Sequence, residues 1–202
     1  MRRTMLSGVA LVALCAGLAQ GQTDSMASHR MQPTAMGAGK PSSVNSPDPR
    51  SYGPEVSKAY EQVRHATAPF RDLKVAIASG YSASVPNCLS DPVAGAMGYH
   101  HINRANLVKE VEVEKPQILL FERRANGDYA LNGVEYIVPY RLWPADSTPP
   151  RVMGRELVRA DGLQLWYMHM WVWKRNKSGL FANYNPDAEC RTPPAPVPTP
   201  GQ

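Results

Sequence analysis

The chain has 202 residues, of which 43% are hydrophobic and 19% charged, with a formal net charge of +5 at pH 7. This length and composition fit one globular domain with a substantial core rather than two. The charges are scattered, without a basic arm or a repeated interleaving of Lys or Arg with aromatic residues, so nucleic acid is not an expected partner.

Residues 1–21 have the pattern of a secretory signal peptide. Two arginines precede an almost uncharged run, residues 5–19, which is rich in Leu, Val and Ala. The small residues at its end predict cleavage after Ala19 or Gly21. Since an apolar run of about fifteen residues is short for a membrane span, we expect no transmembrane segment in the mature chain. The predicted location is the periplasm or the extracellular medium.

Two segments outside the expected fold differ from the rest in composition. Residues 22–54 are poor in large apolar side chains and rich in Ser, Pro, Gly, Met and Ala, which predicts a flexible tether. Residues 191–202 are rich in proline and predict an extended tail. Residues 55–190 are therefore expected to form a single globular domain.

The first part of this domain has helical periodicity. Apolar residues recur at helical spacing within 56–66, and Pro54 just ahead of them suits a helix start. Pro69 interrupts this run. Thr67 is the expected cap of a second helix, and Gly80 is well placed to end that helix in a left-handed conformation.

The remainder of the domain predicts loops and then strands. Residues 81–106 show no clear periodicity and predict a long ordered loop, which in a compact domain is often functional. Strands are predicted at 117–124, 129–138 and 163–173, and an Asn-Gly pair marks a hairpin between the first two. We expect an α+β fold: two N-terminal helices packed on an antiparallel sheet of three or more strands, with long irregular loops.

Three cysteines occur in the sequence, and Cys15 lies in the predicted signal peptide. An exported chain would keep Cys88 and Cys190, which in an oxidising compartment most simply form a disulfide bond. The alternative is a pair of free thiols. A bond closing so long a loop would stabilise the fold by roughly 4.7 kcal/mol in the chain-entropy model.

The predicted strand 163–173 is the most aromatic part of the chain. Alternation places Met168 and Met170 on the face opposite to His169 and Trp171. This arrangement argues against a copper site in which Met168, His169 and Met170 all bind the same ion. Because both faces are largely apolar, the strand is either buried on both sides or lines a pocket with aromatic walls.

Histidine and glutamate side chains in three places could converge. They are His100 or His101 in the 97–103 loop, Glu135 on the second predicted strand and His169 on the third. An inward-facing acid usually has a partner, because burying a lone charge is costly. Two imidazoles and a carboxylate suit a divalent metal ion. No spacing rule links these positions, so hydrogen-bonded core histidines are the competing interpretation.

Six short motifs follow one another through the domain: Ala-Ser-Gly-Tyr (78–81), Asn-Cys-Leu (87–89), Met-Gly-Tyr-His (97–100), Val-Glu-Tyr-Ile-Val-Pro (134–139), Met-His-Met-Trp-Val-Trp-Lys (168–174) and Phe-Ala-Asn-Tyr-Asn-Pro (181–186). In this combination the chain resembles a family of uncharacterised exported bacterial proteins over about residues 56–190. The resemblance implies a compact domain with paired cysteines and implies no activity. Since members carry one histidine at this position, it favours His100.

The leading hypothesis is therefore non-enzymatic binding of a small molecule or a metal ion where the 97–103 loop meets the 163–173 strand. The expected ligand-binding residues are Tyr99, His100, Asn103, Glu135 and Trp171, and the expected metal ligands are His100, His169 and Glu135. A divalent metal ion is the candidate cofactor. Two alternatives stay open, namely a metal-dependent enzyme of unknown substrate and a structural or envelope-interaction protein. No catalytic residue is predicted, since the chain has no Gly-x-Ser-x-Gly motif and no phosphate-binding glycine loop.

Overall fold

A computed structural model describes residues 45–85 and 87–191. The predicted signal peptide, most of the predicted tether and nearly all of the predicted tail lie outside these residues. In the two described ranges, no helix has both the length and the apolar character needed to cross a lipid bilayer.

Short helices open the described chain: η1 (Pro49–Tyr52), α1 (Pro54–Thr67), η2 (Ala68–Arg71) and α2 (Leu73–Ala78). The start of α1 at a proline is as predicted. The second helix begins later than predicted, because Asp72 rather than Thr67 caps it, with its carboxylate accepting a hydrogen bond from the Lys74 backbone N–H at 2.8 Å. Pro69 lies in the intervening 3-10 turn, and Gly80 beyond α2 has φ +102°, in the left-handed region.

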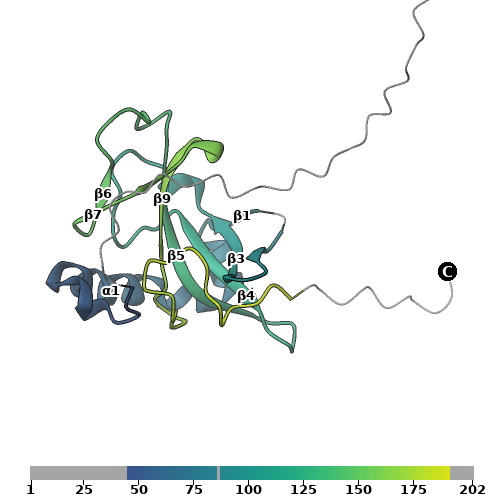
Figure 1. The fold of residues 1–202 in the computed structure, drawn as a ribbon. Coiled ribbons are helices and arrows are strands. Elements are labelled where there is room, and N and C mark those ends of the chain that lie inside the picture. The colour runs from purple at the N-terminus through teal and green to yellow at the C-terminus, as the bar shows by residue number, and fades with distance from the viewer. Residues whose placement is uncertain (1–44, 86, 192–202) are drawn as a thin grey trace, which may run out of the picture. The chain divides into compact units, whose positions relative to one another are not determined.

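A seven-stranded antiparallel sheet forms the body of the molecule (Figure 1). Its strands are β1 (Ala83–Ser84), β2 (Leu89–Asp91), β3 (Gly95–Ile102), β4 (Ile118–Arg123), β5 (Tyr129–Pro139), β8 (Val158–Ala160) and β9 (Leu165–Met170). They are arranged in the order β1-β3-β4-β5-β9-β8, and β2 also pairs with β3. A separate two-stranded hairpin joins β6 (Arg151–Val152) to β7 (Arg155–Glu156). The predicted α+β class, with an antiparallel sheet of three or more strands, is confirmed.

The two faces of the sheet carry different sets of side chains. One face contributes residues such as Tyr136 and Trp166 to the larger core cluster, which also contains Val56 and Val63 of α1. The other face carries a smaller apolar cluster of Ile118, Leu120, Ile137 and Tyr167. Because side chains alternate along a strand, neighbours in sequence belong to different faces. The face with the smaller cluster is called the second face below.

The structure corrects the loop predicted for residues 81–106, because much of this segment is the eight-residue strand β3. Gly95 and Gly98 both have positive φ, +96° and +102°. A side chain at either position would collide with a backbone carbonyl oxygen, that of Asn185 or that of Phe121. These two special backbone positions interrupt the regular strand and remove the alternation by which a strand is recognised.

The domain also begins earlier than its composition predicts. Residues 45–53, expected in the tether, are joined to the far end of the chain, since the Leu180 backbone N–H donates to the Ser46 carbonyl at 2.8 Å. The Tyr52 ring meets the Phe181 ring edge-on, with centroids 5.0 Å apart. A segment with few large apolar residues is thus fixed by one aromatic contact and backbone hydrogen bonds.

The predicted disulfide between Cys88 and Cys190 is confirmed, with a sequence separation of 102 residues. It fastens the end of residues 180–190, called here the closing segment, beside β2. The closing segment also forms an isolated bridge to β3 through Asn185 and Ala96. It is therefore held at several points along its length.

Candidate metal centre

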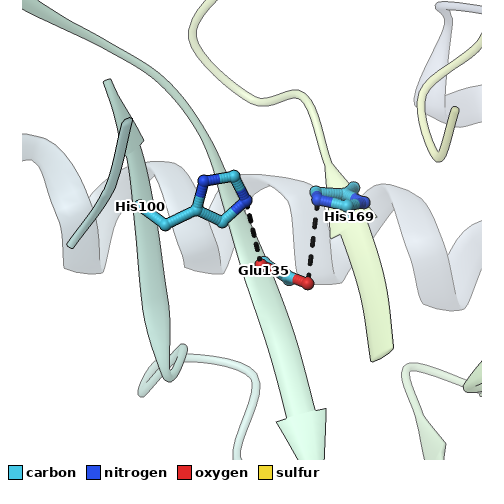
Figure 2. A group of neighbouring side chains, drawn as sticks. All are labelled: His100, Glu135 and His169. Atoms are coloured by element: carbon cyan, nitrogen blue, oxygen red, sulfur yellow. Dashed lines mark ion pairs between the residues drawn. The ribbon is translucent and has the colours of Figure 1, made fainter. Parts of the chain in front are cut away.

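Three strands position His100, Glu135 and His169, called here the His–Glu–His cluster (Figure 2). Glu135 on β5 lies directly opposite His169 on β9. His100 on β3 is paired with Leu120 of β4, the strand between β3 and β5. Leu120 belongs to the second face, and directly paired residues share a face, so all three side chains project from the second face.

The cluster brings together the ligand atoms predicted from the sequence. The His100 Nε2 lies 3.5 Å from the Glu135 Oε2, and the His169 Nε2 lies 3.7 Å from the Glu135 Oε1. The two imidazole centroids are 6.1 Å apart, and one ligand atom from each residue lies within 4.8 Å of the others. Figure 2 shows the two rings side by side, each joined by a dashed line to one oxygen of the Glu135 carboxylate.

These separations differ from those of ordinary hydrogen bonds, which for N–H···O are mostly 2.7–3.2 Å. Four ligands placed tetrahedrally around Zn²⁺ at normal bond lengths lie about 3.4 Å from one another. The two nitrogen–oxygen distances of 3.5 and 3.7 Å are therefore close to the spacing of a metal centre.

Hydrogen bonds at the far side of each ring define which nitrogen faces the carboxylate. The His100 Nδ1 lies 3.1 Å from the Gly98 carbonyl oxygen, and the His169 Nδ1 lies 3.4 Å from the Asn183 Oδ1. Because these oxygens can only accept, each Nδ1 carries the proton, and each neutral ring turns its Nε2 lone pair toward Glu135. Metal-binding histidines typically donate their second ring N–H to a carbonyl or carboxylate in this way.

Burial leaves one of these nitrogens without a partner. The side chains of His100, Glu135 and His169 are 5%, 9% and 2% exposed. The His169 Nε2 is buried and has no hydrogen-bond partner among the described residues. Buried polar atoms are almost always satisfied, so this lone pair, aimed at a carboxylate, calls for a bound species or a proton between them.

Burial also sets the charge of the cluster. It raises the pKa of Glu135 from 4.5 to about 8, and it lowers the pKa of His100 to about 4 and that of His169 to about 3. Without a metal, the cluster is therefore neutral at pH 7, with a protonated carboxyl group and two neutral imidazoles. The histidines are already in the form that binds a metal, whereas the carboxyl group must release its proton.

The structure does not bring the other predicted ligand residues into this cluster. Tyr99 lies on the opposite face of β3 from His100, and its ring contacts Tyr129 at 5.5 Å. Asn103 caps the short turn that follows β3. Trp171 directly follows β9, and its Nε1 donates to the Ala182 carbonyl of the closing segment at 2.6 Å. Each side chain has its own packing or hydrogen-bonding role.

Two residues that support the cluster were not predicted from the sequence. Asn183 of the closing segment accepts from His169, and its Nδ2 donates to the Tyr167 hydroxyl at 2.9 Å. Tyr167 is recognisable by its position, since it precedes His169 by two residues on the same strand face. Asn183 lies in an irregular segment, and its place in the Phe-Ala-Asn-Tyr-Asn-Pro motif was the signal available.

Two surface cavities, of 310 and 210 Å³, lie near the β4–β5 hairpin. Neither is lined by a residue of the His–Glu–His cluster. The cluster is therefore covered by the protein itself rather than placed at the bottom of either cavity.

The arrangement can be compared with those of known proteins only through its chemistry. No protein-family model, characterised protein or solved structure matches this chain.

Proposed function

We propose that the protein binds one divalent transition-metal ion, with zinc the best fit, through the Nε2 atoms of His100 and His169 and the carboxylate of Glu135. The observation that carries this proposal is the orientation of the rings, since both Nδ1 atoms are hydrogen-bonded away from the carboxylate and both Nε2 lone pairs face it. Zinc commonly accepts such a set of imidazole and carboxylate ligands, with a fourth position left for water or another small ligand.

The donor atoms also argue against other metals. Calcium and magnesium prefer six or more oxygen ligands, whereas this cluster offers two nitrogens and one carboxylate. Copper(I) favours thioether sulfur, but Met168 and Met170 contribute to the larger core cluster on the other side of the sheet. A borderline ion such as Zn²⁺ matches the residues present.

We propose that this ion is bound for structural or storage purposes, in a protein exported to the periplasm or the medium. The near-complete burial of the cluster supports a non-catalytic role, because a substrate needs access to the metal. The N-terminal sequence pattern supports export, and the disulfide bond is compatible with an oxidising compartment.

A metal-dependent enzyme is the second candidate. The observation that favours it is the number of ligands, since three protein ligands with one open position are typical of catalytic zinc sites. This alternative predicts hydrolytic turnover that is lost in His169→Ala while the fold is retained.

The metal content of the protein, purified without a histidine tag, tests the proposal. After zinc loading and dialysis, we expect about one zinc per chain in the wild type and none in a His100→Gln/His169→Gln double variant. His101→Gln is the matched control, because this neighbouring histidine contacts Phe121 on the opposite face of the sheet, and it should retain the metal. A wild-type protein that folds but holds no zinc, copper or iron would overturn the proposal.

A further inference from the structure

The larger of the two cavities has features of a second, unrelated binding site. Its volume is 310 Å³, and it lies between η2, the β4–β5 hairpin and the residues that follow β9. The charged residues that line it are Arg71, Arg124, Lys174 and Glu122. The lining therefore contains three positively charged side chains and one negatively charged side chain. The cavity therefore carries an excess of positive charge and shares no residue with the His–Glu–His cluster.

Only part of this positive charge is neutralised within the protein. The Lys174 Nζ lies 2.8 Å from both carboxylate oxygens of Glu122, so these two residues satisfy each other. Across the described ranges, no carboxylate forms an ion pair with Arg71 or Arg124. Two guanidinium groups are thus available to an anion from solution.

One of these guanidinium groups is held in place before any ligand arrives. Arg71 lies over the ring of Trp173, with 5.0 Å between the guanidinium carbon and the ring centroid. The indole is itself fixed, since its Nε1 donates to the Thr67 hydroxyl at 3.0 Å and Arg64 stacks on it at 4.2 Å. A preorganised arginine loses less entropy when it binds, which favours recognition of a planar oxyanion.

A buried amide adds an independent observation. Asn132 lines the cavity and is 2% exposed, yet its Nδ2 has no hydrogen-bond partner among the described residues. The backbone carbonyl oxygen of Asn132 accepts from the Trp173 and Lys174 backbone N–H groups at 2.9 and 3.0 Å, which joins this part of β5 to the residues that follow β9. The wall of the cavity thus contains one unsatisfied amide donor beside two guanidinium groups that no carboxylate of the described ranges neutralises.

We propose that this cavity binds a small organic molecule through a carboxylate or phosphate group, held by Arg71 and Arg124. The volume of 310 Å³ lies at the lower end of small-molecule sites, which start near 300 Å³, and it exceeds what a bare oxyanion would fill. Carboxylate and phosphate groups share the same chemistry, since both carry anionic oxygens that accept several hydrogen bonds from N–H groups.

Isothermal titration calorimetry of the full chain tests this proposal. The probes are succinate, a dicarboxylate that chelates metals weakly, inorganic phosphate, and glycerol as a neutral control. We expect saturable binding of succinate or phosphate at one site per chain, and none of glycerol. Binding of succinate alone would assign a carboxylate ligand, and binding of phosphate alone would assign a phosphate ligand.

Variants show whether the binding occurs in this cavity. In an Arg71→Gln/Arg124→Gln double variant, we expect affinity to fall at least about tenfold, because two charge-assisted hydrogen-bond donors are lost. Arg141→Gln removes one exposed charge elsewhere and should bind as the wild type does. If the double variant does not fold, Arg71→Lys/Arg124→Lys keeps the charge and should still weaken binding. Unchanged affinity in the folded variant, or no binding of either anion at millimolar concentration, would overturn the proposal.

Discussion

Replacing Glu135 with Gln should make the metal-free protein more stable, by an amount that grows with pH. Burial raises the pKa of this carboxyl group from 4.5 to about 8. Between these values the unfolded chain releases the proton whereas the folded chain retains it, so the stability of the wild type falls as pH rises. Glutamine has nearly the same shape and no proton to lose, and the variant therefore escapes this cost.

The size of the effect follows from the pKa shift. At pH 7 the cost to the wild type is on the order of 3 kcal/mol, and above pH 8 it reaches an upper limit on the order of 5 kcal/mol. Below pH 4.5 the carboxyl group is protonated in both states and the two proteins should be equally stable. The two histidines are present in both proteins, so their own titration largely cancels in the comparison.

Urea denaturation in EDTA at pH 5, 7 and 8.5 measures this difference, and in a second series with excess zinc the difference should become smaller. A metal present at about 100 times its dissociation constant stabilises the folded wild type by about 2.7 kcal/mol, whereas the Glu135→Gln variant lacks one ligand and should gain less. If wild type and variant in EDTA lose stability with pH in parallel, the carboxyl group is not buried in its neutral form. The reasoning about the cluster would then fail.

Three further changes have distinct expected effects. The double variant Cys88→Ser/Cys190→Ser should lose about 4–5 kcal/mol of unfolding free energy in urea, and a loss below about 1 kcal/mol would contradict the chain-entropy argument. Gly133→Ala places a methyl group 2.6 Å from the Met170 carbonyl and should cost about 1–3 kcal/mol, whereas Gly162→Ala, with open space around it, should be neutral in the same melts. Asn183→Ala should weaken zinc binding about 10–100-fold in competition with a chelator, and unchanged affinity would remove its orienting role.

The central part of the candidate site could be predicted because two of its strands are regular. Along β5 and β9 the alternation of side chains puts Glu135 and His169 on defined faces. Their direct pairing depends in addition on the register of the two strands, which the structure supplies. A period of two is a local property, which a single sequence displays wherever no bulge interrupts it.

The contribution of β3 could be predicted only in part. Without visible alternation, Tyr99 and His100 could both be assigned to one pocket, whereas on a strand they must face opposite sides. The glycine positions that hide this strand depend on the approach of distant carbonyl groups. Asn183 was missed for a similar reason, because the path of the closing segment is set by long-range contacts and by the disulfide bond.

The closing segment affects how quickly a ligand could leave the His–Glu–His cluster. The cluster draws its side chains from three strands, and Asn183 and the Cys88–Cys190 bond hold a fourth piece of chain close to them. If the proposed ion is bound there, its exchange should require local opening of the sheet or of the closing segment. The residence time of the ion would then be set by the rate of this local opening. Slow local unfolding and slow release of the ion would share one rate-limiting step.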